Sequence, residues 1–197
     1  MSTVGDRRER RGAGKERTRR LRRGISLSFL LALTFAIPLG AGTDTLRTLG
    51  LQMPNEPLEA PAFELLDLNG KKIQLKDFRG KLVFLNFFAT WCGPCRAEMS
   101  GMNRLYLTYR DKGLIILAIN MQEGAKTVRP FVQELKLSFP AVLDTKGLVS
   151  REYGIRALPV SFLVDRDGTI RWRAMGGREW DTPQMREYFG QAVAERK

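Results

Sequence analysis

The sequence predicts an α/β fold in which a mixed central sheet is flanked by helices. Residues 81–88 and 114–120 are nearly unbroken apolar runs rich in β-forming residues, which is typical of strands buried on both faces of a covered sheet. Between these runs, apolar residues recur three and four positions apart from Met99 to Tyr109, and this period indicates a helix.

The other predicted elements are shorter and are separated by turn residues. A β-hairpin is expected first in the domain, with its turn at Asn69–Gly70. Residues 57–197 are numerous enough to bury a sizeable core as one domain. The remaining predicted elements are a helix at 128–135, a strand at 141–143, a hairpin of 160–164 with 169–173, and a closing helix at about 182–195.

The N-terminal region divides into a charged tail, an apolar segment and a linker. Residues 1–24 contain ten Lys or Arg and three acidic residues, which is +7 of the net charge of +12. Residues 25–42 are 18 residues without a charge, which is near the lower limit for a helix that spans a bilayer. The positive-inside rule predicts a cytoplasmic tail and sends the rest of the chain across the membrane. Residues 43–56 are interpreted as a linker, because Pro54 limits regular structure there.

Two outcomes fit residues 25–42. A cleaved signal peptide has an apolar core of about 7–15 residues and a small-residue cleavage site, and residues 39–42 offer such a site. An uncleaved anchor fits the length better and places the protein in the inner membrane, with the domain in the periplasm or outside the cell. Cleavage would instead release a secreted, soluble domain. Because most of the excess positive charge lies in the tail, no nucleic-acid partner is predicted.

Cys92 and Cys95 are the only cysteines of the chain, which has no histidine. A structural zinc site needs four nitrogen or sulfur ligands, so this pair would supply one only if a dimer shared the metal. A purely structural disulfide would close a very short loop and constrain the unfolded chain little. The spacing best suits redox exchange, in which one thiolate attacks a substrate disulfide and the second thiol resolves the mixed disulfide.

The helix predicted after residues 81–88 explains how one sulfur becomes reactive. Pro94 is expected in its first turn, where the missing N–H costs nothing. Cys92 is then expected at the helix N-terminus, whose unpaired N–H groups and positive dipole favour a thiolate. Cys95 lies one turn further and should be the more buried thiol. We therefore predict that Cys92 is the nucleophile and Cys95 the resolving residue, with their redox-active disulfide as the only redox group and with no metal.

Residues 88–95, Phe-Ala-Thr-Trp-Cys-Gly-Pro-Cys, resemble the active-site segment of the thioredoxin superfamily. The further motifs that resemble the TlpA- and ResA-type membrane-anchored thioredoxins are residues 60–65, 75–81, 95–99 and 176–180. Several separated motifs in the family's order make the resemblance specific. It covers about residues 57–195 and implies a thioredoxin fold with an N-terminal β-hairpin extension.

The resemblance also implies a substrate-docking surface around the cysteines. Gly93 and Pro94 complete the motif, and Trp91 is expected to cover the disulfide and contact substrate instead of lying in the core. Pro159 matches the proline that is cis in this family and packs beside the sulfurs, which leaves the backbone of Leu158 free to pair with a bound peptide. From the residues alone, Pro159 is a proline at the first position of a strand, and a cis bond is implied only by the resemblance.

The thiol proton of Cys95 needs an acceptor, and Glu98 is the candidate. Thioredoxin has a buried aspartate six residues before its first cysteine, and here that position is Asn86, which cannot take up a proton. Glu98 lies one helical turn after Cys95 and matches a glutamate of ResA-type proteins, so a carboxylate with a raised pKa could accept the proton of Cys95. The alternative is a solvated glutamate on the helix surface, paired with Arg96, with Arg104 or with no partner.

The resemblance implies a thiol-disulfide oxidoreductase that reduces particular protein disulfides, as in cytochrome c or cytochrome oxidase biogenesis, and that receives electrons from a membrane donor. One alternative is a tethered Cu(I)-binding or metal-delivery module, for which two thiolates suffice. Another is a thiol peroxidase, because the opening at residues 60–63 is shared with peroxiredoxin-like chains. The cysteine motif at 91–95 does not match the surroundings of a peroxidatic cysteine, which makes this alternative the weaker one.

Overall fold

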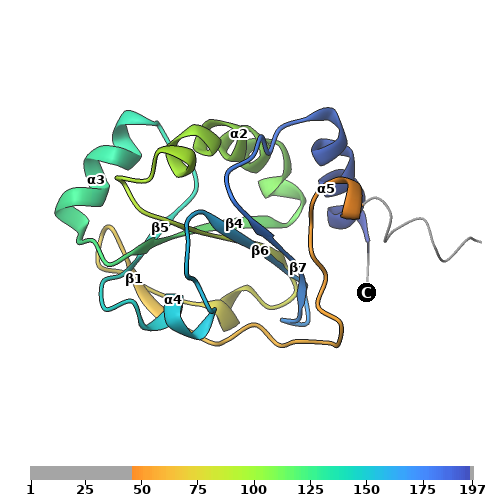
Figure 1. Ribbon diagram of the computed structural model, residues 1–197, viewed down its shortest axis with the longest axis horizontal. Helices are drawn as coiled ribbons and strands as arrows, with labels where there is room; N and C mark the ends of the chain where they lie inside the picture. The colour runs from red at the N-terminus through yellow and green to blue at the C-terminus, as the bar shows by residue number, and fades with distance from the viewer. Residues whose placement is uncertain (1–45, 196–197) are drawn as a thin grey trace, which may run out of the picture. The chain divides into compact units, whose positions relative to one another are not determined.

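The computed structural model describes residues 46–195, and this part of the chain is built around a seven-stranded mixed sheet with the order β2-β1-β5-β4-β3-β6-β7 (Figure 1). The strands are β1 (Glu64–Asp67), β2 (Lys72–Gln74), β3 (Leu82–Phe88), β4 (Leu114–Met121), β5 (Ala141–Asp144), β6 (Val160–Val164) and β7 (Ile170–Met175). β3, β4 and β5 run parallel, and the outer strands pair antiparallel on both sides.

β3 lies between β4 and β6, so both of its edges are hydrogen-bonded. All seven of its residues are buried, as its apolar sequence predicts for a strand covered on both faces. Asn86 is the exception in chemistry, because it is polar. Its register partners are Ala118 on β4 and Ser161 on β6. The centre of the sheet therefore holds a buried amide that needs hydrogen-bond partners.

Helices cover both faces of the sheet. One face carries the three longest described helices, and the other carries a short helix and a 3-10 turn (Figure 1). The elements of the first face are α2 (Gly93–Tyr109), α3 (Ala125–Glu134) and α5 (Pro183–Ala194), those of the second are α4 (Leu148–Glu152) and η1 (Leu75–Phe78), and the 3-10 turn η2 (Arg110–Lys112) follows α2.

Alternate residues of β3 enter two separate cores, because successive side chains of a strand point to opposite faces. Phe84 belongs to the core under α2 and α5, where its ring meets Trp180 edge-on with centroids 4.7 Å apart. Phe87 belongs to the core on the α4 side, where its ring centroid lies 5.1 Å from that of Tyr153. The sheet is thus covered by two apolar layers, and the cysteine motif belongs to the first.

The predicted mixed sheet, its flanking helices and both hairpins are confirmed. Two details differ. α3 begins at Ala125, three residues before the predicted start at 128, because its first turn is polar and gives no apolar period. α4 was not predicted, since five residues are too few to show a helical period.

Residues 46–56, within the predicted linker, pack on the domain. Leu46 and Leu51 are buried in the core under α2, and Gln52 forms an antiparallel bridge with Arg173 of β7. The predicted membrane or signal segment at 25–42 lies outside the described residues. Among residues 46–195, no helix combines the length and the apolar character needed to span a bilayer.

Candidate active site

The cysteine pair lies where β3 gives way to α2. Cys92 is the N-cap residue of α2, with extended backbone angles, and its sulfur accepts a hydrogen bond from Cys95 N at 3.3 Å. The two residues form a disulfide. Cys95 has no exposed surface, whereas Cys92 is 5% exposed, so Cys95 is the more buried sulfur, as predicted.

The first turn of α2 supplies an environment that favours a thiolate at Cys92. Pro94 lies in this turn, and the turn contains no acidic residue, so no local carboxylate offsets the positive end of the helix dipole. Free backbone N–H groups at this end favour negative charge on the capping sulfur. The roles of Cys92 as the nucleophile and Cys95 as the resolving residue stay predictions.

Trp91 lies outside the core, with 75% of its surface exposed. A purely structural role in packing is therefore excluded for this tryptophan, and contact with a docking partner stays a prediction. Gly93 begins α2, and apart from its chain neighbours and the local helix backbone, no heavy atom lies within 4 Å of the Cβ that a larger residue would carry there. Trp91 and Gly93, on either side of Cys92, are thus both exposed.

The peptide bond between Leu158 and Pro159 is cis, as the resemblance implied. Pro159 directly precedes β6, whose first residue Val160 pairs with Phe87 near the end of β3. The cysteine motif starts a few residues after Phe87. This register therefore places the cis bond and the motif at the same end of the paired strands β3 and β6. Pro159 and Leu158 also line a cavity of about 430 Å³.

A glycine pair connects the cis proline to α2. Gly176 N donates to the carbonyl of Pro159 at 2.9 Å. A Cβ on Gly177 would lie 3.0 Å from the Cβ and the carbonyl oxygen of Pro94, which is tighter than most Cβ contacts. The backbone of this segment therefore passes between the cis proline and the first turn of α2, and a larger residue at Gly177 would require Pro94 to move by a few tenths of an ångström.

Glu98 is a buried carboxylate, with only 2% of its surface exposed. Its Oε1 accepts from Asn86 Nδ2 at 2.8 Å, and its Oε2 accepts from Trp180 Nε1 at 2.9 Å and from Arg178 N at 3.3 Å. Burial raises the pKa of Glu98 from 4.5 to about 6, although the hydrogen bonds and the nearby Arg178 charge act in the opposite direction. A group with this pKa exchanges its proton near neutral pH.

The alternative of a solvated Glu98 is wrong. Arg96 pairs with Glu134 at 2.7 Å, and Arg104 pairs with Asp181 at 2.5 Å and with Glu179 at 3.3 Å. Both predicted arginine partners are therefore engaged with other carboxylates. A small surface cavity of about 280 Å³ has Glu98 in its wall, which gives this otherwise buried group a short route to solvent.

A second glutamate beside the motif was not predicted from the sequence. Glu123, after the end of β4, accepts from Thr90 N at 2.8 Å, from Thr90 Oγ1 at 2.6 Å and from Asn120 Nδ2 at 2.7 Å. Partial burial acts to raise the pKa of Glu123, but the hydrogen bonds from Asn120 and Thr90 outweigh it and lower the pKa below 4.5. Glu123 thus stays ionised and holds the loop that precedes Cys92.

Three other contributors were missed as site residues. Trp180 was predicted to pack, and it is buried, but its hydrogen bond to Glu98 has no local signal in the sequence. Arg178 and Ser161 belong to segments that were assigned only to the fold. The motif at residues 176–180 was the one available indication, since it matched the family without an assigned role.

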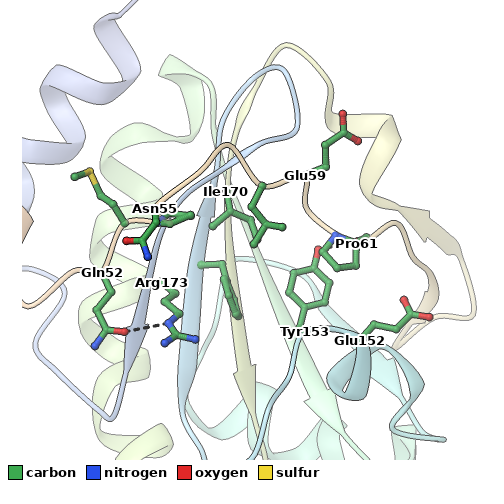
Figure 2. Close-up of a pocket in the computed structure, with 12 residues that line it drawn as sticks. Gln52, Asn55, Glu59, Pro61, Glu152, Tyr153, Ile170 and Arg173 are labelled. Carbon is green, nitrogen blue, oxygen red and sulfur yellow. Dashed lines mark hydrogen bonds between the residues drawn. The ribbon is translucent and has the colours of Figure 1, made fainter.

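The cavity drawn in Figure 2 has a volume of about 430 Å³ and contains neither cysteine. It lies between residues 52–61 and the sheet, where Gln52 and Arg173 are hydrogen-bonded and Tyr153 points toward Pro61 (Figure 2). It shares Tyr153, Phe162 and Arg173 with the cavity beside Pro159. Among residues 46–195, no cluster of three or more Cys, Asp or Glu side chains has a geometry that could hold a metal ion.

Comparisons with known proteins find a family model, sequence relatives and solved structures similar to this chain. The model of the AhpC/TSA family matches residues 58–173. The thiol-disulfide oxidoreductase ResA of Bacillus thuringiensis subsp. konkukian is 47% identical over 131 residues, which is 66% of this chain and 75% of that protein. ResA of Bacillus subtilis is 37% identical over 158 residues, which is 79% of this chain and 84% of that protein.

A solved structure gives the same result. A protein of Chlorobium tepidum described as a thiol:disulfide interchange protein DsbE has a TM-score of 0.65 and 31% sequence identity, over 71% of this chain and 99% of that one. The residues matched by the family model, 58–173, include β3, α2 and both cysteines.

Proposed function

The chain belongs to the AhpC/TSA family and is a thiol-disulfide oxidoreductase of the thioredoxin superfamily, and from this premise we propose that it reduces particular protein disulfides outside the cytoplasm. The observation that carries the proposal is the Cys92–Cys95 disulfide at the N-terminus of α2, with the buried Glu98 one turn further along the same helix. On the resemblance to ResA-type proteins, the proposed substrates are proteins of cytochrome c or cytochrome oxidase biogenesis.

The reaction begins with the reduced protein. The Cys92 thiolate attacks one sulfur of the substrate disulfide, so a Cys92–substrate bond forms and the substrate S–S bond breaks, releasing the first substrate thiolate. Cys95 then attacks the Cys92 sulfur and loses its thiol proton to the Glu98 carboxylate. The second substrate thiolate leaves. The substrate gains two electrons, and Cys92 and Cys95 lose two as their disulfide forms.

Trp91, Leu158 and Pro159 are the proposed docking residues. The exposed indole of Trp91 offers apolar contact area beside Cys92. The cis peptide and the cavity beside it offer an extended polypeptide a place at the same end of β3 and β6 as the motif. Substrate selection would then depend on the sequence around the substrate disulfide.

We further propose that residues 25–42 anchor the protein in the inner membrane, with residues 1–24 in the cytoplasm and the domain on the other side. The support is the arginine-rich tail in front of an uncharged segment. Each turnover leaves Cys92 and Cys95 oxidised, so a membrane electron donor must reduce them again. Pelleting of the chain with membranes tests the anchor, and a soluble product that begins near Thr43 would contradict it.

The catalytic proposal is tested with the full-length chain in mild detergent. Reduced wild-type protein should reduce a protein disulfide, and Cys92→Ser should lose this activity completely. Cys95→Ala should accumulate a mixed disulfide between Cys92 and the substrate, which also identifies the partner. Full reductase activity in Cys92→Ser would contradict the mechanism, and tight Cu(I) binding without disulfide reduction would favour the metal-delivery alternative.

A further inference from the structure

Asn86 has an unusual set of hydrogen bonds for a buried amide. It lies on β3 with no exposed surface, and its Nδ2 donates to Glu98 Oε1 at 2.8 Å and to Ser161 Oγ at 3.0 Å. Its Oδ1 has no hydrogen-bond partner among residues 46–195. Both N–H groups of the amide are therefore used, while the acceptor on the other side of the same group is free.

The orientation of this amide follows from the charge on Glu98. An ionised carboxylate only accepts hydrogen bonds, so the amide nitrogen must face it. The hydroxyl of Ser161 both donates and accepts, so it does not determine the orientation. Asn86 thus presents the side that suits a charged Glu98.

Protonation of Glu98 changes what Asn86 must provide. The Oε2 atom faces two donors, Trp180 Nε1 and Arg178 N, and neither of them can accept a hydrogen bond from a protonated Oε2. A proton on Glu98 is therefore placed on Oε1, which faces Asn86. Asn86 Nδ2 cannot accept a hydrogen bond either, so in the present orientation its N–H would face the O–H of protonated Glu98.

We propose that Asn86 is a positioning residue whose side-chain amide turns over when Glu98 takes up a proton. After the half turn, Oδ1 accepts from the new Glu98 Oε1–H and from Ser161 Oγ–H, and Nδ2 occupies the place of the present Oδ1. The covalent change is one proton transfer: an O–H bond forms on Glu98 as the S–H bond of Cys95 breaks, or, in the oxidised protein, as an O–H bond of hydronium breaks. The role in turnover rests on the proposed function of Glu98, whereas the rotation itself does not.

The neighbouring Asn120 shows why the rotation is specific to Asn86. Asn120 is equally buried, and its Oδ1 also has no partner among the described residues. Its Nδ2 donates to Glu123, which stays ionised at neutral pH because its pKa is lowered. Asn120 therefore always faces an ionised carboxylate that requires a donor, and it serves as an internal control.

The titratable and charged groups that face Glu98 come from four elements. From β3 and β6 it meets Asn86 and, through it, Ser161, and neither is charged. From the segment before α5 it meets Trp180 and the Arg178 cation, with Glu179 in the wall of the same small cavity. On α2 itself, Cys95 does not titrate while it is disulfide-bonded. The oxidised protein therefore isolates Glu98.

The test is an NMR titration of the oxidised full-length chain in mild detergent, between about pH 5 and pH 7.5, on both sides of the Glu98 pKa of about 6. The nuclear Overhauser effect from the Asn86 Nδ2 protons to Ser161 Hβ should be strong at high pH. It should weaken severalfold as the carboxyl carbon of Glu98 titrates, with the same midpoint. The Asn120 amide should not change.

Glu98→Gln is the second arm. The Gln oxygen must face Trp180 Nε1 and Arg178 N, so its NH₂ faces Asn86 and requires Oδ1. This variant should show the reversed amide at every pH. A constant Asn86 pattern in the wild type and an unreversed amide in Glu98→Gln would overturn the rotation. Because no turnover is measured, that result would leave the reductase proposal standing, and loss of the reductase proposal would leave the rotation standing.

Discussion

Two buried asparagines on the neighbouring strands β3 and β4 each donate to a glutamate near the cysteine motif, and the two carboxylates behave in opposite ways. Asn86 donates to Glu98, and Asn120 donates to Glu123. Each glutamate accepts three hydrogen bonds, yet the pKa of Glu98 is raised to about 6 while that of Glu123 is lowered. Hydrogen bonds favour the charged form in both cases, so their number does not explain the difference.

The difference lies in burial. Glu98 is almost fully enclosed under α2, whereas Glu123 is half-buried at the end of β4. Desolvation penalises the charged form, and at Glu98 this penalty is larger than the stabilisation of the carboxylate by its three hydrogen-bond donors. The enclosed pair is therefore suited to proton exchange, and the open pair is suited to holding a permanently charged carboxylate against the loop at Thr90.

The largest expected difference between the two pairs is in the rate of mixed-disulfide resolution. Glu98→Gln should slow the Cys95-dependent resolution of the mixed disulfide by about 10²–10⁴-fold, as loss of a general base does, and should remove its pH dependence near pH 6. Glu123→Gln is the matched control and should leave the pH profile in place. Stopped-flow measurement of resolution against pH decides between them, and an unchanged profile in Glu98→Gln would remove Glu98 from the mechanism.

The donors to Glu98 give the next effect. Trp180→Phe removes the Nε1–H bond to Glu98 Oε2, so the pKa of Glu98 should rise further. The protein should lose about 1.5–3 kcal/mol of stability at pH 8, where Glu98 is ionised, because a hydrogen bond to a charged group is worth that much. The loss should shrink below pH 5.

Trp172→Phe is the control for Trp180→Phe. Its Nε1 donates to Tyr188 OH at 2.8 Å, and its ring stacks against Trp180 in the same core. The two variants lose the same chemical group, but only one loses a contact with Glu98. Denaturant unfolding at pH 5 and pH 8 should show a pH-dependent cost for Trp180→Phe alone. Equal pH dependence in both would mean that aromatic packing explains the effect.

The wild-type stability curve gives an effect of similar size. The pKa of Glu98 is about 6 in the folded state against 4.5 ordinarily, so between these values the folded state binds more protons than the unfolded state. The free energy of unfolding attributable to Glu98 should therefore fall by about 2 kcal/mol as pH rises from about 4.5 to 6, and stay level above. Glu98→Gln should lack this fall. Glu123 has the opposite sign, since its stabilisation is lost as pH falls below 4.5.

The smallest expected effect is at the open pair. Thr90→Val removes the hydroxyl that donates to Glu123 at 2.6 Å. Because Glu123 is only half-buried and water can replace this donor, the cost should be about 0.5–1.5 kcal/mol, less than for the buried bond to Glu98, and the pKa of Glu123 should rise toward 4.5. The Glu98 titration should not move. Chemical denaturation and a carboxyl-carbon NMR titration measure both quantities, and a shifted Glu98 midpoint would show that the two pairs are coupled.

Much of the fold was accessible from sequence because its elements are regular. β3 and β4 are unbroken apolar strands, and α2 has a clear helical period with Pro94 in its first turn. α4 was missed because a five-residue helix has no period to detect. The thiol chemistry was equally accessible, since two cysteines at this spacing and a helix N-terminus are properties of one short segment.

The proton-exchanging site required the tertiary structure. The sequence alone determined that Cys92 and Cys95 share a helix start with Glu98 one turn beyond. It left open whether Glu98 was solvated, because its donors Asn86, Arg178 and Trp180 lie 12, 80 and 82 residues away. Burial depends on which distant segments pack together, and burial sets the pKa of a carboxylate. Folding therefore decided that Glu98 titrates near neutral pH and that Glu123 does not.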